Sequence, residues 1–131
     1  YLFWEGKKKG GITPSKGFVL AKEEVSDFLN DSLEKLGLNA QEKADFMEFW
    51  EPRILANNQP YVFMSFLGTQ EFNKIAPLNI TPAPDTLIRV FMYYHPLSTQ
   101  FEVMPQKLTK IPRRGFTVIE WGGTSSSLWQ Y

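Results

Sequence analysis

Two stretches of this chain carry apolar residues at the three- and four-residue spacing of an amphipathic helix. The first starts at about residue 22 and ends at Gly37, a residue type that commonly follows the last turn of a helix. Glu23 and Glu24 suit the positive end of the helix dipole in its first turn. The apolar positions predict one buried face, formed by Val25, Phe28, Leu29, Leu33 and Leu36.

The second helical stretch follows a short connector. Asn39 and Glu42 have the three-residue spacing of a capping box, which predicts that the helix begins there. Pro52 is predicted to end or kink it near residues 50–51, because proline has no N–H to donate. With so tight a connector, the two helices are expected to form an αα-hairpin. The apolar positions of the second helix are Phe46, Met47, Trp50 and Ile54.

The strongest strand signal lies at residues 86–94, where successive side chains are expected to point to opposite faces of a sheet. One face is predicted to carry Ile88, Val90, Met92 and Tyr94, and the other Leu87, Arg89, Phe91 and Tyr93. Residues 95–98 are interpreted as the turn that follows this strand.

Five further segments are predicted to be short strands: residues 2–5, 17–20, 60–67, 101–104 (as the return strand) and 116–121. Residues 77–84 contain three prolines and are predicted to form an extended loop. A helical hairpin beside several short strands indicates an α+β fold, in which an antiparallel or mixed sheet packs with the two helices.

Composition excludes several classes of function. The 131 residues include 14 basic and 14 acidic side chains, and this zero net charge argues against a protein that binds nucleic acid by neutralising phosphates. The chain has no cysteine, which excludes disulfides, thiolate metal sites and a cysteine nucleophile. With a single histidine, we expect no metal site and no cofactor.

The domain organisation is predicted as one α+β domain over residues 1–124, followed by a flexible tail over residues 125–131. Because the sequence opens on strand-like residues at Tyr1, we expect the domain to be the C-terminal part of a larger β-rich protein. No apolar run reaches the ~20 residues of a membrane helix, so no membrane span is predicted.

Several segments together resemble a family of uncharacterised microbial proteins, many of them exported or attached to the cell surface. The most specific is the closing run Gly115–Thr124, which reads Gly-Phe-Thr-Val-Ile-Glu-Trp-Gly-Gly-Thr. Other matching segments are residues 1–5, 17–19, 28–39, 45–46, 49–50, 58–61, 77–80, 84–85 and 89–92. The resemblance implies an extracellular or cell-surface location and an N-terminal β segment of the same protein as partner. It implies no activity and no catalytic residue.

Four residues are the candidates for acid–base chemistry: Glu5, Asp85, Glu120 and His95. The three carboxylates lie in apolar settings, and a pair of such acids serves as general acid and base in glycoside hydrolysis. Histidine is the side chain type best suited to proton transfer near neutral pH, but His95 has no second histidine or cysteine with which to bind a transition metal. Spacing along the chain does not show whether any two of these groups meet.

Arg89 shares its predicted strand face with Leu87 and Phe91, so its charge needs a partner there. The structural interpretation pairs Arg89 with Glu120 or Glu5 inside the sheet. Aromatic side chains favour core packing but also suit a platform for a sugar or peptide. The candidate binding residues are Trp4, Arg89, Tyr93 and Trp121.

Two main functions remain open, and an oligomerisation domain is a third option. The leading hypothesis is a non-catalytic binding or structural module of an exported microbial protein, with a β segment, a neighbouring domain, a glycan or a peptide as partner. The alternative is a hydrolase that uses paired carboxylates on a glycan or peptide substrate. Two carboxyl groups facing each other across an open cleft would favour the hydrolase. An exposed strand edge or an aromatic groove would favour the binding module.

Overall fold

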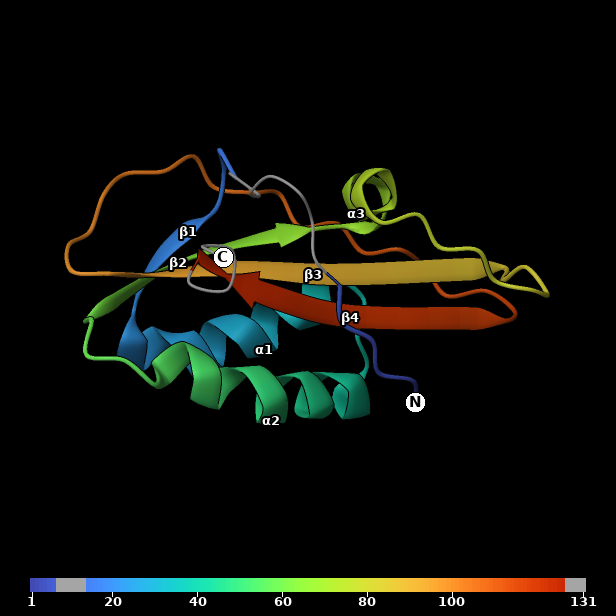
Figure 1. Cartoon of the computed structure of the whole chain (residues 1–131), viewed down its shortest axis with the longest axis horizontal. Coiled ribbons are helices and arrows are strands. Elements are labelled where there is room, and N and C mark those ends of the chain that lie inside the picture. The colour runs from blue at the N-terminus through green and yellow to red at the C-terminus, as the bar shows by residue number, and fades with distance from the viewer. Residues whose placement is uncertain (7–13, 127–131) are drawn as a thin grey trace.

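The computed structural model describes residues 1–6 and 14–126 (Figure 1). The fold is α+β, as the sequence predicted. Its elements follow in the order β1 (Phe18–Ala21), a short 3-10 helix η1 (Lys22–Glu24), α1 (Val25–Lys35), α2 (Ala40–Leu55), β2 (Tyr61–Leu67), α3 (Thr69–Ile75), β3 (Thr86–Leu97) and β4 (Thr117–Ser125).

The four strands form one mixed sheet in the order β1-β2-β3-β4. β1 pairs antiparallel with β2, and β2 pairs antiparallel with β3. β3 and β4 run parallel, with Thr86 opposite Thr117 and Tyr94 opposite Ser125. β4 therefore lies at one edge of the sheet and the short strand β1 at the other.

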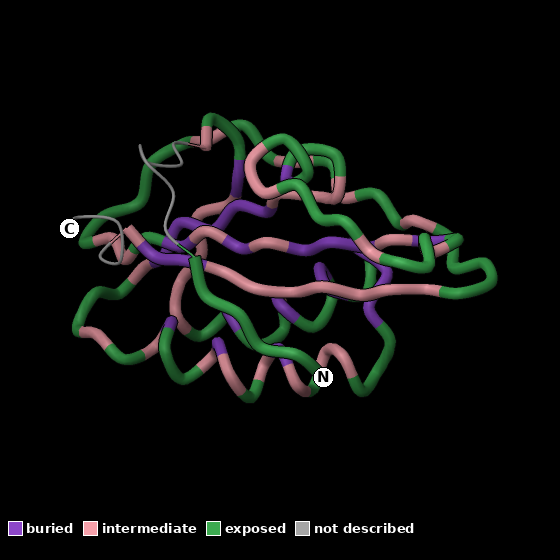
Figure 2. Tube along the Cα trace, turned by 45° about the vertical axis from the view of Figure 1, so that its right-hand side comes forward, coloured by how far each residue is buried: buried purple, intermediate pink, exposed green. Residues whose placement is uncertain are grey.

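The predicted helical hairpin is present and covers one face of the sheet (Figures 1 and 2). Gly37 has a φ of 101°, a left-handed conformation that glycine adopts without strain, and it ends the turn after α1. The capping box at the start of α2 is also confirmed. The Asn39 side chain accepts from the Glu42 N–H at 2.9 Å, and the Glu42 carboxylate accepts from the Asn39 N–H at 2.8 Å.

The main core lies between this hairpin and the sheet. Alternation along β3 is as predicted. The four even-numbered residues from Ile88 to Tyr94 enter this core, while Arg89, Phe91 and Tyr93 lie on the other face. α3 packs on that second face, where the Phe72 and Phe91 rings stack with centroids 4.6 Å apart. Core residues include Val25, Leu29, Leu33, Phe46, Trp50, Ile54, Val62, Met64, Phe66, Ile88, Val90 and Met92.

Two predicted strands are absent. Residues 1–6 are extended and exposed but pair with no strand among the described residues. Residues 101–104 form no strand either, and only Met104 makes an isolated parallel bridge, to Lys16. The physical reason is that the connection from β3 does not turn back as a hairpin. It returns along the sheet beside β1 and β2, so that β4 can start at the same end as β3 (Figure 1).

Two boundaries also differ from the sequence prediction. The second helix does not end near residues 50–51, because α2 continues through Pro52 to Leu55 and its apolar face still buries Ile54, which is 1% exposed. The predicted turn at residues 95–98 is largely strand, since β3 extends to Leu97. Pro96 is tolerated because β4 ends opposite Tyr94, so β3 has a neighbour on only one side at Pro96.

Candidate functional site

The most concentrated polar site lies on the face of the sheet that carries α3, around Arg89. This side chain is 1% exposed, and its Nε donates to the carboxylate of Glu120. One guanidinium nitrogen, Nη1, donates to Asn73 Oδ1 at 2.9 Å and also to the Ala76 carbonyl. The Arg89 guanidinium carbon lies 4.2 Å from the centre of the Phe72 ring. The buried charge is thus compensated by one anion, two neutral acceptors and an aromatic face.

Strand register brings the ion pair together, because Arg89 and Glu120 are partners in the parallel ladder between β3 and β4. α3 is held to the same point at its first turn, where Thr69 Oγ1 accepts from the Arg89 backbone N–H at 2.9 Å. The interpretation that pairs Arg89 with Glu120 inside the sheet therefore agrees with the geometry.

Glu120 also binds the N-terminal segment. Its second carboxylate oxygen accepts from Trp4 Nε1 at 2.9 Å, across 116 residues of sequence. Residues 1–4, here called the N-terminal strip, cross β4 and extend beyond the sheet in both overall views (Figures 1 and 2). Exposed fractions fall along the strip from 105% at Tyr1 through 96% at Leu2 and 68% at Phe3 to 53% at Trp4.

The other two candidate binding residues lie apart from this contact. Tyr93 is on the same face, half-buried, with its ring centroid 6.1 Å from that of Phe63, and burial raises the pKa of its phenol. Trp121 is on the opposite face, against α2, with centroid distances of 5.4 Å to Phe46 and 6.3 Å to Phe49. The four predicted binding residues therefore do not form one platform.

Asp85 has a local structural role. Its carboxylate accepts from the Phe116 N–H at 2.7 Å, next to Gly115, whose φ is 61°. A Cβ added to Gly115 would lie 2.2 Å from Asp85 Oδ2, so the turn requires glycine at this point. This contact fixes the start of β4 beside the start of β3.

His95 and Glu5 are both exposed. His95 Nδ1 contacts the Ser126 hydroxyl just after β4. Glu5 lies next to Trp4 in the N-terminal segment, whereas Glu120 already accepts from Arg89 and Trp4. These contacts supply no acid–base pair at an open cleft.

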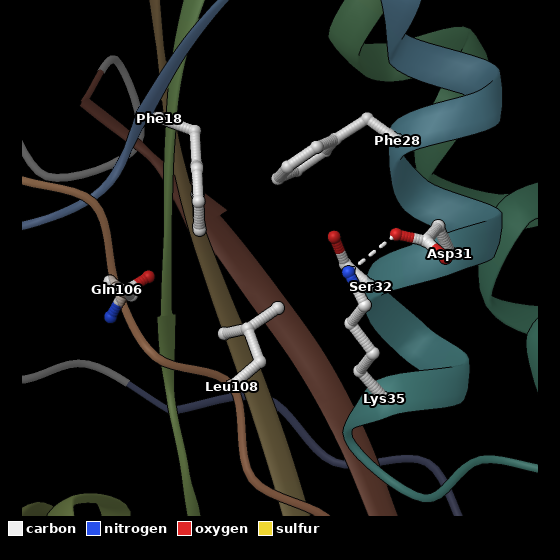
Figure 3. Close-up of a pocket in the computed structure, with 7 residues that line it drawn as sticks. All are labelled: Phe18, Phe28, Asp31, Ser32, Lys35, Gln106 and Leu108. Carbon is white, nitrogen blue, oxygen red and sulfur yellow. Dashed lines mark ion pairs between the residues drawn. The ribbon is translucent and has the colours of Figure 1, made fainter.

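Two surface hollows lie elsewhere, and none of the eight predicted site residues lines either of them. The larger, of about 380 Å³, lies between α1 and β1 (Figure 3). Apolar side chains from Phe18, Phe28 and Leu108 face it, and an exposed ion pair from Lys35 to Asp31, 2.8 Å long, lies beside it. The second, of about 290 Å³, borders the end of β2.

Another ion pair joins the connection between β3 and β4 to the helical hairpin. Arg113 donates to the Glu42 carboxylate and, at 2.8 Å, to the Gly37 carbonyl. Burial acts to raise the pKa of Glu42, but hydrogen bonds from Arg113 and the Asn39 N–H together with the charge of Arg113 outweigh it and lower that pKa. The same pair raises the pKa of Arg113.

Residues 1–6 and 14–126 contain no group of three or more histidine, aspartate or glutamate side chains placed to hold a metal ion. No helix within those residues is both long enough and apolar enough to cross a membrane.

No similar protein was found. The chain matches no protein-family model, and neither curated proteins nor solved structures show significant similarity to it. The binding role is therefore argued from the geometry.

The residues that sequence reasoning missed are Phe72 and Asn73 of α3 and Ala76, which directly follows this helix. α3 has seven residues and buries only Phe72, so its periodic signal is too short to detect. The available hint was Gly68, followed by Thr69 and by Phe72 and Ile75 at a helical spacing of three.

Proposed function

We propose that the chain is a non-catalytic binding or structural module of an exported microbial protein. It docks a β-rich segment of the same protein, or of a neighbouring domain, through the N-terminal strip. The observation that carries the proposal is the exposure of four consecutive large apolar side chains beside the sheet. Contiguous apolar surface of this kind typically marks an interaction site.

The Trp4–Glu120 hydrogen bond supports a docking role, because it fixes one end of the strip to the sheet through a carboxylate that Arg89 already orients. An anchored strip presents its other side chains with less loss of conformational entropy on binding than a free tail does. The exported location rests on the sequence resemblance alone.

The alternative hydrolase has no supporting observation. Glu120 is engaged by Arg89 and Trp4, and Asp85 by the Phe116 N–H. Neither of the two hollows contains a candidate acid. No second function is therefore proposed.

The test is hydroxyl-radical footprinting of two samples, the 131-residue chain alone and the complete gene product purified from its source cell. Residues 1–4 should be oxidised readily in the first and protected several-fold in the second. Phe101 and Phe116, which are 51% and 47% exposed on other parts of the molecule, serve as internal controls. Equal oxidation of residues 1–4 in both samples would overturn the proposal, and fractionation of the same cells tests the location.

A further inference from the structure

The two edges of the sheet differ in their backbone hydrogen bonding. β4 pairs only with β3 among the described residues, and no backbone hydrogen bond joins the other side of its residues 117–124 to another described segment. An edge strand presents a row of N–H and C=O groups that another chain can use as a template. The N-terminal strip crosses this edge, but within the described chain it makes no backbone hydrogen bond to it.

The opposite edge is closed beside the start of β1 by side chains and loop backbone. The Gly17 N–H donates to the Met104 carbonyl at 3.0 Å, and the Ser65 hydroxyl donates to the Lys16 carbonyl at 2.8 Å. Beyond the end of β1, the Gln106 amide takes the place of a strand. It accepts from the Phe66 N–H and donates to the Phe66 carbonyl, both at 2.8 Å. The fold thus satisfies the part of one edge next to the start of β1, and among the described residues it leaves residues 117–124 at the other edge without a backbone partner.

One of the two glycines of β4 also indicates that another chain can approach this edge. Gly123 has an internal reason, because an added Cβ would lie 2.9 Å from the Met92 carbonyl and 3.1 Å from the Trp50 ring. Gly122 has none, since its Cβ would meet Phe91 at an ordinary 3.7 Å. A glycine inside a strand without internal crowding is typical of a place where another backbone approaches closely.

The side chains of β4 also lack the devices that keep edge strands apart. Its sequence, Thr-Val-Ile-Glu-Trp-Gly-Gly-Thr-Ser, has no lysine and no proline. Its only charged residue is Glu120, whose charge is compensated by Arg89. Natural edge strands are commonly protected by just these residue types.

We propose that the outer edge of β4 accepts an extended strand of polypeptide, with a large apolar side chain beside Gly122. This inference rests on the proposed function and specifies its partner as an uncharged β-strand paired through backbone hydrogen bonds. The side chain beside Gly122 covers the half-buried ring of Phe91, as cross-strand aromatic groups do for edge glycines. The N-terminal strip lies across the same edge and supplies apolar cover for the added strand.

The probe is a short fluorescein-labelled peptide in which valine and threonine alternate around a central phenylalanine. Binding to the 131-residue chain is followed by fluorescence polarisation. The matched control peptide carries prolines, which cannot donate backbone hydrogen bonds. The expected result is saturable binding of the first peptide and none of the second, because strand addition depends on the main chain.

Two lysine variants locate the site. Gly122→Lys places a charge on the open edge and should weaken binding at least tenfold, without a change in thermal unfolding. Val19→Lys places the same charge on β1, at the opposite edge of the sheet, and should leave peptide affinity unchanged. Val118→Lys is a second variant on β4, to be used if Gly122→Lys unfolds, and circular dichroism checks the fold of each.

The inference is wrong if the first peptide fails to bind up to about 1 mM, or if Gly122→Lys and Val118→Lys bind it as the wild type does. Its failure is distinguishable from failure of the proposed function. Protection of residues 1–4 in the complete gene product, with no peptide binding at β4, would keep the docking module and remove the added strand.

Discussion

Arg89 and Glu120 occupy paired positions on the parallel strands β3 and β4, and their ion pair is where four segments of the chain meet. α3 reaches it through Asn73, and the N-terminal strip reaches it through Trp4. Because Arg89 is 1% exposed, its charge depends on these partners rather than on water.

Removal of the anion should destabilise the fold strongly. We expect Glu120→Gln to lower the free energy of unfolding by about 3 kcal/mol, because the Arg89 charge stays buried without its counter-ion. Urea denaturation measures the loss, and Glu102→Gln, at an exposed position, is the control. The double change Arg89→Met with Glu120→Leu should recover part of the stability. A Glu120→Gln variant as stable as the control would contradict the dependence of Arg89 on Glu120.

The hydrogen bond from Trp4 to Glu120 should hold the strip without supporting the core. Trp4→Phe keeps an aromatic ring but removes the N–H donor, so we expect a loss of only about 1 kcal/mol in unfolding free energy. NMR chemical shifts of residues 1–6 should move toward those of an unstructured peptide. Trp129→Phe, outside the described residues, is the matched control. Unchanged shifts in Trp4→Phe would show that the strip is held by other contacts.

The two adjacent glycines of β4 should respond oppositely to a methyl group. Gly123→Ala forces a Cβ against the Met92 carbonyl and the Trp50 ring, and overpacking of this kind costs about 1–3 kcal/mol. Gly122→Ala meets only Phe91 at 3.7 Å, and we expect a change within about 0.5 kcal/mol. Thermal unfolding of the two variants compares them directly. Equal losses would show that neither site is governed by internal crowding.

Glu42 should make stability depend on acid. Its pKa in the folded protein is lowered below the ordinary 4.5, so its contribution is complete above that value and is lost as pH falls through the folded pKa. Glu42→Gln should therefore be less stable than wild type at neutral pH, by about 1 kcal/mol. The difference should shrink as the pH falls below 4.5. Urea melts across this range test it, with Glu48→Gln as the exposed control, and a constant difference would contradict it.

Stability at the edge of β2 beyond β1 should depend on the Gln106 amide. Gln106→Ala leaves the N–H and C=O of Phe66 without this partner, which should cost about 1–3 kcal/mol. Amide hydrogen exchange at Phe66 should accelerate, because its partner is removed. Gln100→Ala changes an exposed glutamine in the same connection and should have little effect. Unaltered exchange at Phe66 would mean that the loop closes this edge without the amide.

Periodic elements were predictable because their packing is local. The apolar face of α1 and the alternation along β3 repeat over enough residues to stand out, and both are confirmed. The pairing of Arg89 was also predictable, since a cation among Leu87 and Phe91 requires a counter-charge. Glu120 was one of two carboxylates named for it.

The errors arise where a distant segment decides the outcome. Residues 2–5 have strand-like composition, but they do not pair with β4, the edge strand that they cross. Residues 101–104 are apolar enough for a return strand, but the parallel register of β4 sends this segment along the opposite edge. Pro52 has a strong local preference that burial of Ile54 overrides. α3 is held by Phe72 and by the buried Arg89, which local pattern does not reveal.

The connection from residue 98 to residue 116 performs two tasks with one length of chain. It carries the backbone back so that β4 can run parallel to β3, and on the way it places Met104 and Gln106 against the other edge. Surface loops usually tolerate insertions and deletions. This one is constrained at both ends and in the middle. A deletion here would shift the register of β4 and remove the hydrogen bonds that Met104 and Gln106 make beside β1. Changes in the length of this connection should therefore be selected against more strongly than changes of residue.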